Sequence, residues 1–135
     1  MGYRSDVAIA FYTTKDEQIE FVKIWVKEKM PKNEWFVDSL TEFRTGYLFE
    51  VEDVKWYDTY GHIQDVNTFV ELFVNTFCGG DEDDPDEYGV CEFVRVGEEF
   101  TDIEVETYGH YCQYLLSVCR HIDTENVVGF LGAKS

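Results

Sequence analysis

Val7-Ala8-Ile9-Ala10-Phe11-Tyr12 is an unbroken apolar run of six residues near the start of the chain. A run of this length, with β-branched and aromatic residues, is typical of a strand that is buried on both faces. We therefore place a central strand here and expect the rest of the chain to pack around it.

Two segments have the apolar spacing of an amphipathic helix. In the first, apolar residues recur three or four positions apart at Ile19, Val22, Val26 and Met30. Thr14 and Glu17 have the spacing of a capping box at its start, and Pro31 would stop it. The second runs over residues 63–77 and is followed by Gly79, a residue typical of helix ends. Both segments are predicted to be helices.

The remaining apolar segments favour strands over residues 35–43, 47–51, 88–96 and 100–107. Segment 111–122 fits either a strand or a helix, and we prefer the strand because its alternation is longer and rich in β-formers. The order strand-helix-strand-strand-helix-strand-strand predicts a single α+β domain over residues 1–135. Its single mixed or antiparallel sheet would carry two helices on one face, in a ferredoxin-like or related fold. The other face would be left to water, a partner or a second copy.

The chain has a formal net charge of −17, and the charge is unevenly distributed. Residues 1–40 hold seven acids and six bases, residues 41–80 seven and two, and residues 81–135 fourteen and three. Such a field repels nucleic acid and anionic membranes and attracts the basic grooves of nucleic-acid-binding proteins. Solubility alone would also explain it. With no export signal at the N-terminus, we expect a cytoplasmic protein in which Cys78, Cys91, Cys112 and Cys119 are free thiols.

Three strings resemble short phage- and prophage-associated proteins without assigned chemistry. They are Gly2-Tyr3-Arg4-Ser5-Asp6-Val7, Glu92-Phe93-Val94-Arg95-Val96-Gly97-Glu98-Glu99 and Asp102-Ile103-Glu104. The resemblance covers about a third of the chain and implies a viral or prophage origin, which would place the protein in the cytoplasm of a host cell. It implies no active residue.

The metal-binding patterns are incomplete. Asp81, Asp83 and Glu92 match positions 1, 3 and 12 of a calcium loop, but the glycine position is Asp86. His110, Cys112, Cys119 and His121 lack the usual spacing of a structural zinc site. We therefore predict no metal and no cofactor.

Catalytic motifs are also missing, and we predict a protein that is not an enzyme. The best catalytic candidates would be Asp58 and His62, beside Tyr57 and Tyr60.

Acidic residues recur two positions apart in two expected strands, and so each set would point to one side of the sheet. Our main hypothesis is a phage-encoded inhibitor whose acidic surface blocks the nucleic-acid site of a basic host defence protein, such as a restriction, nuclease or CRISPR effector. The residues predicted to bind this partner are Glu50, Glu52, Asp81, Glu82, Asp83, Asp84, Asp86, Glu98, Glu99, Asp102, Glu104 and Glu106.

The segment from Trp56 to Tyr60 holds three aromatic rings in five residues. Aromatic residues at this density in a loop often anchor a binding partner, although they also plug the ends of cores. The alternative hypothesis is therefore a homo-oligomeric or scaffold-binding module. It would bind through the open sheet face or through Trp56, Tyr57 and Tyr60, and a homodimer is one form it could take.

Overall fold

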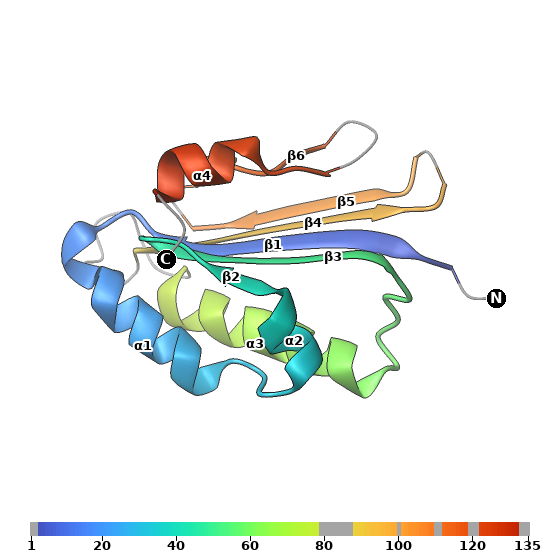
Figure 1. Ribbon diagram of the computed structural model, residues 1–135, viewed down its shortest axis with the longest axis horizontal. Helices are drawn as coiled ribbons and strands as arrows, with labels where there is room; N and C mark the ends of the chain where they lie inside the picture. The colour runs from blue at the N-terminus through green and yellow to red at the C-terminus, as the bar shows by residue number, and fades with distance from the viewer. Residues whose placement is uncertain (1–2, 79–87, 100, 110–111, 119–121, 133–135) are drawn as a thin grey trace.

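The computed structural model describes residues 3–78, 88–99, 101–109, 112–118 and 122–132. Its centre is a five-stranded antiparallel sheet with the strand order β2-β3-β1-β4-β5 (Figure 1). The strands are β1 (Ser5–Thr13), β2 (Leu40–Glu42), β3 (Gly46–Val54), β4 (Gly89–Gly97) and β5 (Ile103–Tyr108). The apolar run is the central strand, and the predicted α+β class is confirmed.

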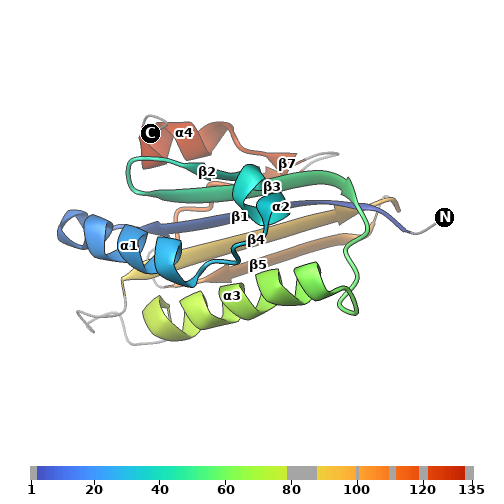
Figure 2. The same cartoon turned by 60° about the horizontal axis from the view of Figure 1, so that its bottom comes forward.

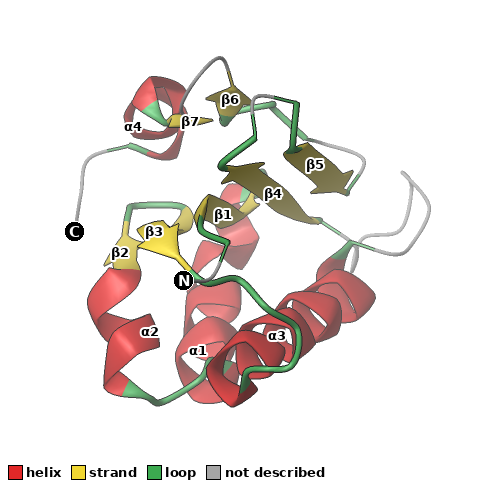
Figure 3. Cartoon of the chain, turned by 90° about the vertical axis from the view of Figure 1, so that its right-hand side faces the viewer, coloured by secondary structure: helices red, strands yellow, loops and turns green. Residues whose placement is uncertain are grey.

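Three helices cover one face of the sheet, which we call the helical face (Figures 2 and 3). They are α1 (Ile19–Lys29), α2 (Glu34–Ser39) and α3 (Gly61–Phe77). Phe11 of β1 packs against Phe69 and Phe73 of α3, with ring centroids 5.2 and 5.3 Å apart. The two predicted helices are therefore present, but a third lies with them. The capping box is not formed, because α1 follows a short 3-10 turn, Asp16–Gln18, without a side-chain cap.

Helix α2 occupies the first half of segment 35–43, where a strand was predicted. Asn33 caps this helix, since its Oδ1 accepts a hydrogen bond from the backbone N–H of Phe36 at 2.8 Å. The Phe36 ring is fully buried and stacks on Phe49 of β3, with centroids 4.8 Å apart. The cap and this contact decide in favour of a helix, and only the three residues of β2 remain extended.

The opposite face of the sheet is covered as well, and so the prediction of an open face is wrong. The chain after β5 returns across it as β6 (Ser117–Val118), β7 (Ile122–Asp123) and α4 (Glu125–Leu131) (Figure 1). We call the described residues 112–118 and 122–131 the C-terminal cover. Leu115, Leu116 and Val127 of this cover are buried against the small side chains of Ala8 and Ala10.

A buried polar pair lies beneath the C-terminal cover. The Tyr12 hydroxyl donates to Glu92 Oε2 at 2.5 Å and accepts from the Gln113 N–H at 2.9 Å. Glu92 Oε1 accepts from the Leu116 N–H at 3.1 Å. The protein therefore holds residues 113–116 to the sheet through hydrogen bonds. These bonds explain why segment 111–122 is neither the predicted long strand nor a helix in its described residues.

Candidate functional site

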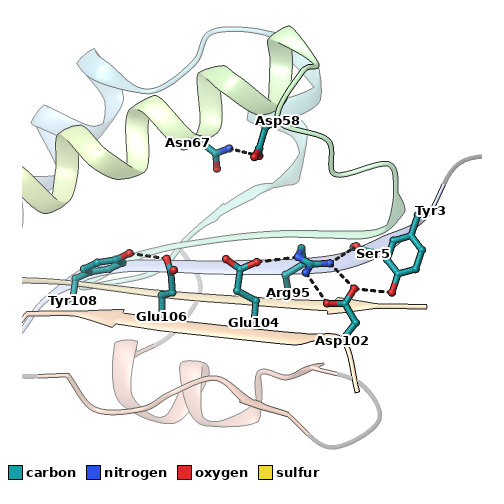
Figure 4. Close-up of polar contacts among 9 residues, drawn as sticks. All are labelled: Tyr3, Ser5, Asp58, Asn67, Arg95, Asp102, Glu104, Glu106 and Tyr108. Atoms are coloured by element: carbon teal, nitrogen blue, oxygen red, sulfur yellow. Dashed lines mark hydrogen bonds and ion pairs between the residues drawn. The ribbon is translucent and has the colours of Figure 1, made fainter. Parts of the chain in front are cut away.

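A groove runs between helix α3 and strand β5 on the helical face, and we call it the α3–β5 groove. It encloses about 960 Å³. Its walls come from α3, from β4 and β5, and from the segment that joins β3 to α3; Tyr3 closes one end. Figure 4 shows that side chains of β4 and β5 point towards the side on which Asp58 and Asn67 lie. The volume is within the range of ligand-binding pockets.

The groove has an apolar part built mainly by Trp56, Val70, Val74 and Phe93. The Trp56 ring also packs against the core. Its centroid lies 6.3 Å from that of Phe93 and 6.4 Å from that of Phe49. Trp56 therefore belongs both to the core and to the groove. The core packing expected of this segment is present at Trp56, and its role as a binding anchor stays a prediction.

The other two aromatic residues of this segment differ in position. Tyr57 lines the groove, and its hydroxyl oxygen accepts a hydrogen bond from the Tyr3 N–H at 2.5 Å. Tyr60 is 36% exposed and stacks on His62, with ring centroids 5.8 Å apart. Of the three rings predicted to anchor a partner, Trp56 and Tyr57 line the groove, whereas Tyr60 lies outside it.

The base of the groove near Tyr3 holds an ion-pair cluster centred on Arg95. The Arg95 guanidinium donates to both carboxylate oxygens of Asp102, at 2.8 and 3.2 Å, and to Glu104 Oε1 at 3.1 Å. It also donates to Ser5 Oγ, while the Tyr3 hydroxyl donates to Asp102 at 2.6 Å (Figure 4). These bonds connect the β4–β5 hairpin to the beginning of β1.

The cluster changes the interpretation of two predicted partner-binding residues. Hydrogen bonds from Arg95 and Tyr3 hold the pKa of Asp102 below its usual range, and the same Asp102 bond raises the pKa of Arg95. The backbone near Asp102 is also tightly packed, since a Cβ on Gly97 would lie 2.2 Å from Asp102 Oδ2. Asp102 and Glu104 are both paired with Arg95, and the bonds of Asp102 join the β4–β5 hairpin to Tyr3.

The remaining groove carboxylates have no basic partner in the part of the chain that the structure describes. Glu106 accepts a hydrogen bond from the Tyr108 hydroxyl at 2.6 Å, a bond that raises the pKa of Tyr108 to about 12. Asp58 lies 3.5 Å from Asn67 Nδ2, and Glu71 lines the α3 side. Among the described residues, five acidic side chains and one basic side chain therefore line the groove, and that basic side chain is already paired.

The predicted partner-binding residues outside the groove lie on other surfaces. Glu50 pairs with Ala8 in the sheet, and Ala8 faces the C-terminal cover, so Glu50 and Glu52 lie on the face opposite Glu104 and Glu106. Partial burial, followed by the charge of Glu52, raises the pKa of Glu50. The two rows therefore do not combine into one acidic face.

Glu98 and Glu99 occupy the turn between β4 and β5. The Glu98 carboxylate accepts from the Arg4 N–H at 2.9 Å, and the Glu99 N–H donates to the Tyr3 hydroxyl oxygen at 3.0 Å. The other predicted residues lie outside the described part of the chain, namely Asp81, Glu82, Asp83, Asp84 and Asp86.

The catalytic and metal candidates do not form a site among the described residues. The His62 ring packs edge-on against Trp35 at 4.7 Å, whereas Asp58 contacts Asn67. No group of three or more metal-ligating side chains occurs in the described residues. His110, Cys119 and His121 lie outside these residues, while Cys78 is buried and the thiols of Cys91 and Cys112 are free.

Sequence reasoning missed two features of the structure. The first is the groove itself, whose walls come from segments that are separated in the sequence, such as α3 and β5. The second is Glu92, which was considered only as part of a calcium pattern. A lone acidic residue inside the apolar segment 88–96 was the available signal that this position is buried and hydrogen-bonded.

Comparisons with protein-family models, curated proteins and solved structures found no match to this chain. In the described residues, every helix is too short or too polar to cross a membrane.

Proposed function

We propose that the protein is a non-enzymatic, phage-encoded inhibitor that binds a basic host defence protein and blocks its nucleic-acid site. The observation that carries the proposal is the α3–β5 groove, where Glu71 and Glu106 lack a basic partner among the described residues and Arg95 is already neutralised. A basic side chain of a partner would find both carboxylates and apolar surface there. The inhibitor would act in the cytoplasm of the host cell.

The distribution of charge favours capture of a basic protein without a close copy of duplex DNA. Glu50 and Glu52 lie on one face of the sheet, and Glu104 and Glu106 lie on the other. A charge of −17 spread in this way attracts a positive groove from many orientations and raises the association rate. Short-range contacts in one place would then hold the complex.

The fold supports this role by positioning the walls of the groove. The element order and the strand order β4-β1-β3-β2 support a ferredoxin-like core, to which β5 adds one strand. The additional strand creates one wall of the groove. The alternative proposal, a binding module acting through the aromatic segment, is favoured only by the partly exposed Tyr60 ring. In that case charge would contribute only to solubility, and the module would bind a scaffold or form a homodimer.

The test is competition with nucleic acid. Purified restriction, nuclease and CRISPR effector proteins are titrated with this protein, and their binding to labelled DNA is measured at low and high salt. We expect DNA binding by at least one effector to fall at low salt and to recover as salt screens the carboxylates. Undiminished DNA binding by every effector at low salt would contradict the proposal.

The Tyr60→Ala variant distinguishes the two proposals. Tyr60 lies outside the groove and carries no groove charge. We expect this variant to inhibit as well as the wild type. If inhibition is lost in Tyr60→Ala and does not depend on salt, the aromatic module is supported instead.

A further inference from the structure

Strand β5 is an edge strand of unusual composition. It is the last strand of the sheet, and in the described part of the chain it pairs only with β4. Its residues 103–107 are exposed, including Ile103 at 42% and Val105 at 56%. An edge strand presents every second N–H and C=O away from its neighbour, and proteins usually protect such edges because another strand can pair with them.

The two sides of β5 differ in chemistry. Glu104 pairs with Arg95 and Glu106 pairs with Phe93, so both glutamates lie on the helical face and line the groove. Ile103 and Val105 alternate with them and point to the opposite face. One side of the edge is therefore acidic and the other is apolar.

We propose that the outer edge of β5 accepts an extended segment of the partner protein in which basic and apolar residues alternate. This inference rests on the proposed function and specifies its contact surface. The segment would add a sixth strand to the sheet. Its basic side chains would lie beside Glu104 and Glu106 and opposite Glu71 of α3, and its apolar side chains would cover Ile103 and Val105.

Charge complementarity favours a basic partner segment at the edge of β5 over a second copy of this chain. Pairing of β5 with β5 of another copy would place glutamates beside glutamates, and like charges in opposed positions destabilise a sheet. The net charge of −17 on each copy adds to the repulsion. Arg95 cannot compensate, because its guanidinium is already bonded to Asp102, Glu104 and Ser5.

The probe is a labelled synthetic peptide in which lysine and valine alternate over about eight residues, measured by fluorescence anisotropy at low salt. The control peptide has the same composition with its lysines and valines in separate blocks. We expect the alternating peptide to bind about tenfold or more tightly than the block peptide, because only alternation places every lysine on the acidic side. Equal binding of the two peptides would overturn the proposal.

Two N-methylated forms of the alternating peptide test main-chain pairing. Each is methylated at every second residue, so that one form loses the N–H groups of one edge and the second form those of the other edge. Only one edge of an added strand faces β5, and therefore one form is expected to bind like the parent peptide and the other to lose binding. Any other pattern would overturn the edge-strand model.

The matched variants are Glu71→Gln/Glu106→Gln and Glu50→Gln/Glu52→Gln. Each removes two negative charges, the first pair from the groove and the second from the opposite face. We expect the first double variant to bind the alternating peptide at least fivefold more weakly than the second. Circular dichroism and thermal unfolding check that both remain folded, and equal binding by the two variants would overturn the inference.

The same variants separate this inference from the proposed function. If both double variants inhibit DNA binding by the effector equally well, the protein is an inhibitor that does not use β5, and only this inference fails. If no effector is inhibited but the alternating peptide binds β5 as expected, the edge is a binding site and the proposed function fails.

Discussion

The two faces of the central sheet are covered in different ways. On the helical face, large side chains such as Phe11 and Phe49 pack against rings from α2 and α3, among them Phe36 and Phe73. On the other face, β1 offers Ala8 and Ala10, and a largely non-helical segment approaches closely. There the Tyr12–Glu92 pair provides hydrogen bonds that hold residues 113 and 116 to the sheet.

The difference indicates that apolar burial holds the helical face together. The face under the C-terminal cover is held by apolar contacts together with a few buried hydrogen bonds. Apolar burial is distributed over many residues, whereas a buried hydrogen bond depends on a single partner. We therefore expect the helical face to show the larger single losses of stability, and the C-terminal cover to be the part that can be loosened selectively.

The largest effect is expected for Phe73→Ala on the helical face. Phe73 is fully buried and its ring contacts Phe11, Trp25 and Phe77. Replacement of a buried phenylalanine by alanine leaves a cavity and costs about 3–5 kcal/mol. Urea unfolding measures the loss. The control is Leu72→Ala, the neighbouring position on α3, where the side chain is 43% exposed and the cost should stay below about 1 kcal/mol.

A smaller and more local effect is expected for Tyr12→Phe beneath the C-terminal cover. The change removes the hydroxyl that bonds Glu92 and the Gln113 N–H, at a cost of about 1–3 kcal/mol in a buried site. Hydrogen exchange should show that residues 115–118 lose protection while α1 and α3 keep theirs. The control is Tyr114→Phe, whose ring is 69% exposed. Uniform loss of protection across both faces would contradict the expectation that the C-terminal cover can be loosened selectively.

The sequence predicted the helical face well because periodicity reports apolar burial directly. The central strand followed from its unbroken apolar run, and both long helices followed from the spacing of their apolar residues, such as Phe69, Phe73 and Phe77 of α3, which are buried. Helix α2 was missed because its formation depends on the Asn33 cap and on a ring contact between Phe36 and Phe49. Such a contact joins residues distant in sequence and leaves no periodic trace.

The C-terminal cover could not be predicted for a related reason. Its described elements β6 and β7 have two residues each, and α4 has seven, too few for a clear period. The candidate site was predicted in part. Glu104, Glu106, Trp56 and Tyr57 do line the groove, but Arg95 was not recognised as the residue that neutralises Asp102. Pairing across a hairpin requires a register, and the sequence alone did not fix one.

Alkaline titration provides a third test, because the Tyr12 hydroxyl is buried against a carboxylate. Burial, followed by the bond to Glu92, raises the pKa of Tyr12 far above its usual range. A raised folded-state pKa contributes stability that is complete below the unfolded value of about 10 and is lost as pH rises towards the folded value. Between about pH 8 and about pH 11, the free energy of unfolding of the wild type should therefore fall by about 1.4 kcal/mol more than that of Tyr12→Phe.

Urea midpoints across this pH range measure the difference, together with phenolate absorbance. The stability gap between wild type and variant should narrow as pH rises. Tyr47 on the helical face is present in both proteins, and burial raises its pKa as well, so its contribution cancels. A gap that stays constant to about pH 11 would mean that Tyr12 ionises normally and that the cover admits water.

The smallest effect concerns a half-buried carboxylate on the helical face, which can be compared with the fully buried Glu92. Glu42 of β2 accepts from two lysines of α1, Lys23 at 2.8 Å and Lys27 at 3.3 Å. The bond from Lys23 is the main reason that the pKa of Glu42 lies below its usual value. The Glu42 side chain is 30% exposed, and water and salt weaken the attraction.

Glu42→Gln should therefore cost only about 0.5 kcal/mol at neutral pH, measured by urea unfolding at low salt. A depressed folded-state pKa contributes stability above the unfolded value of about 4.3, and this contribution is lost as pH falls through the folded value. The difference between wild type and variant should accordingly vanish in acid and shrink at high salt. The control is Glu28→Gln, whose carboxylate lies 3.8 Å from Lys29 of the same helix and should contribute less. If Glu42→Gln costs as much as Tyr12→Phe, burial does not set the strength of these polar contacts, and the two faces are held together in the same way.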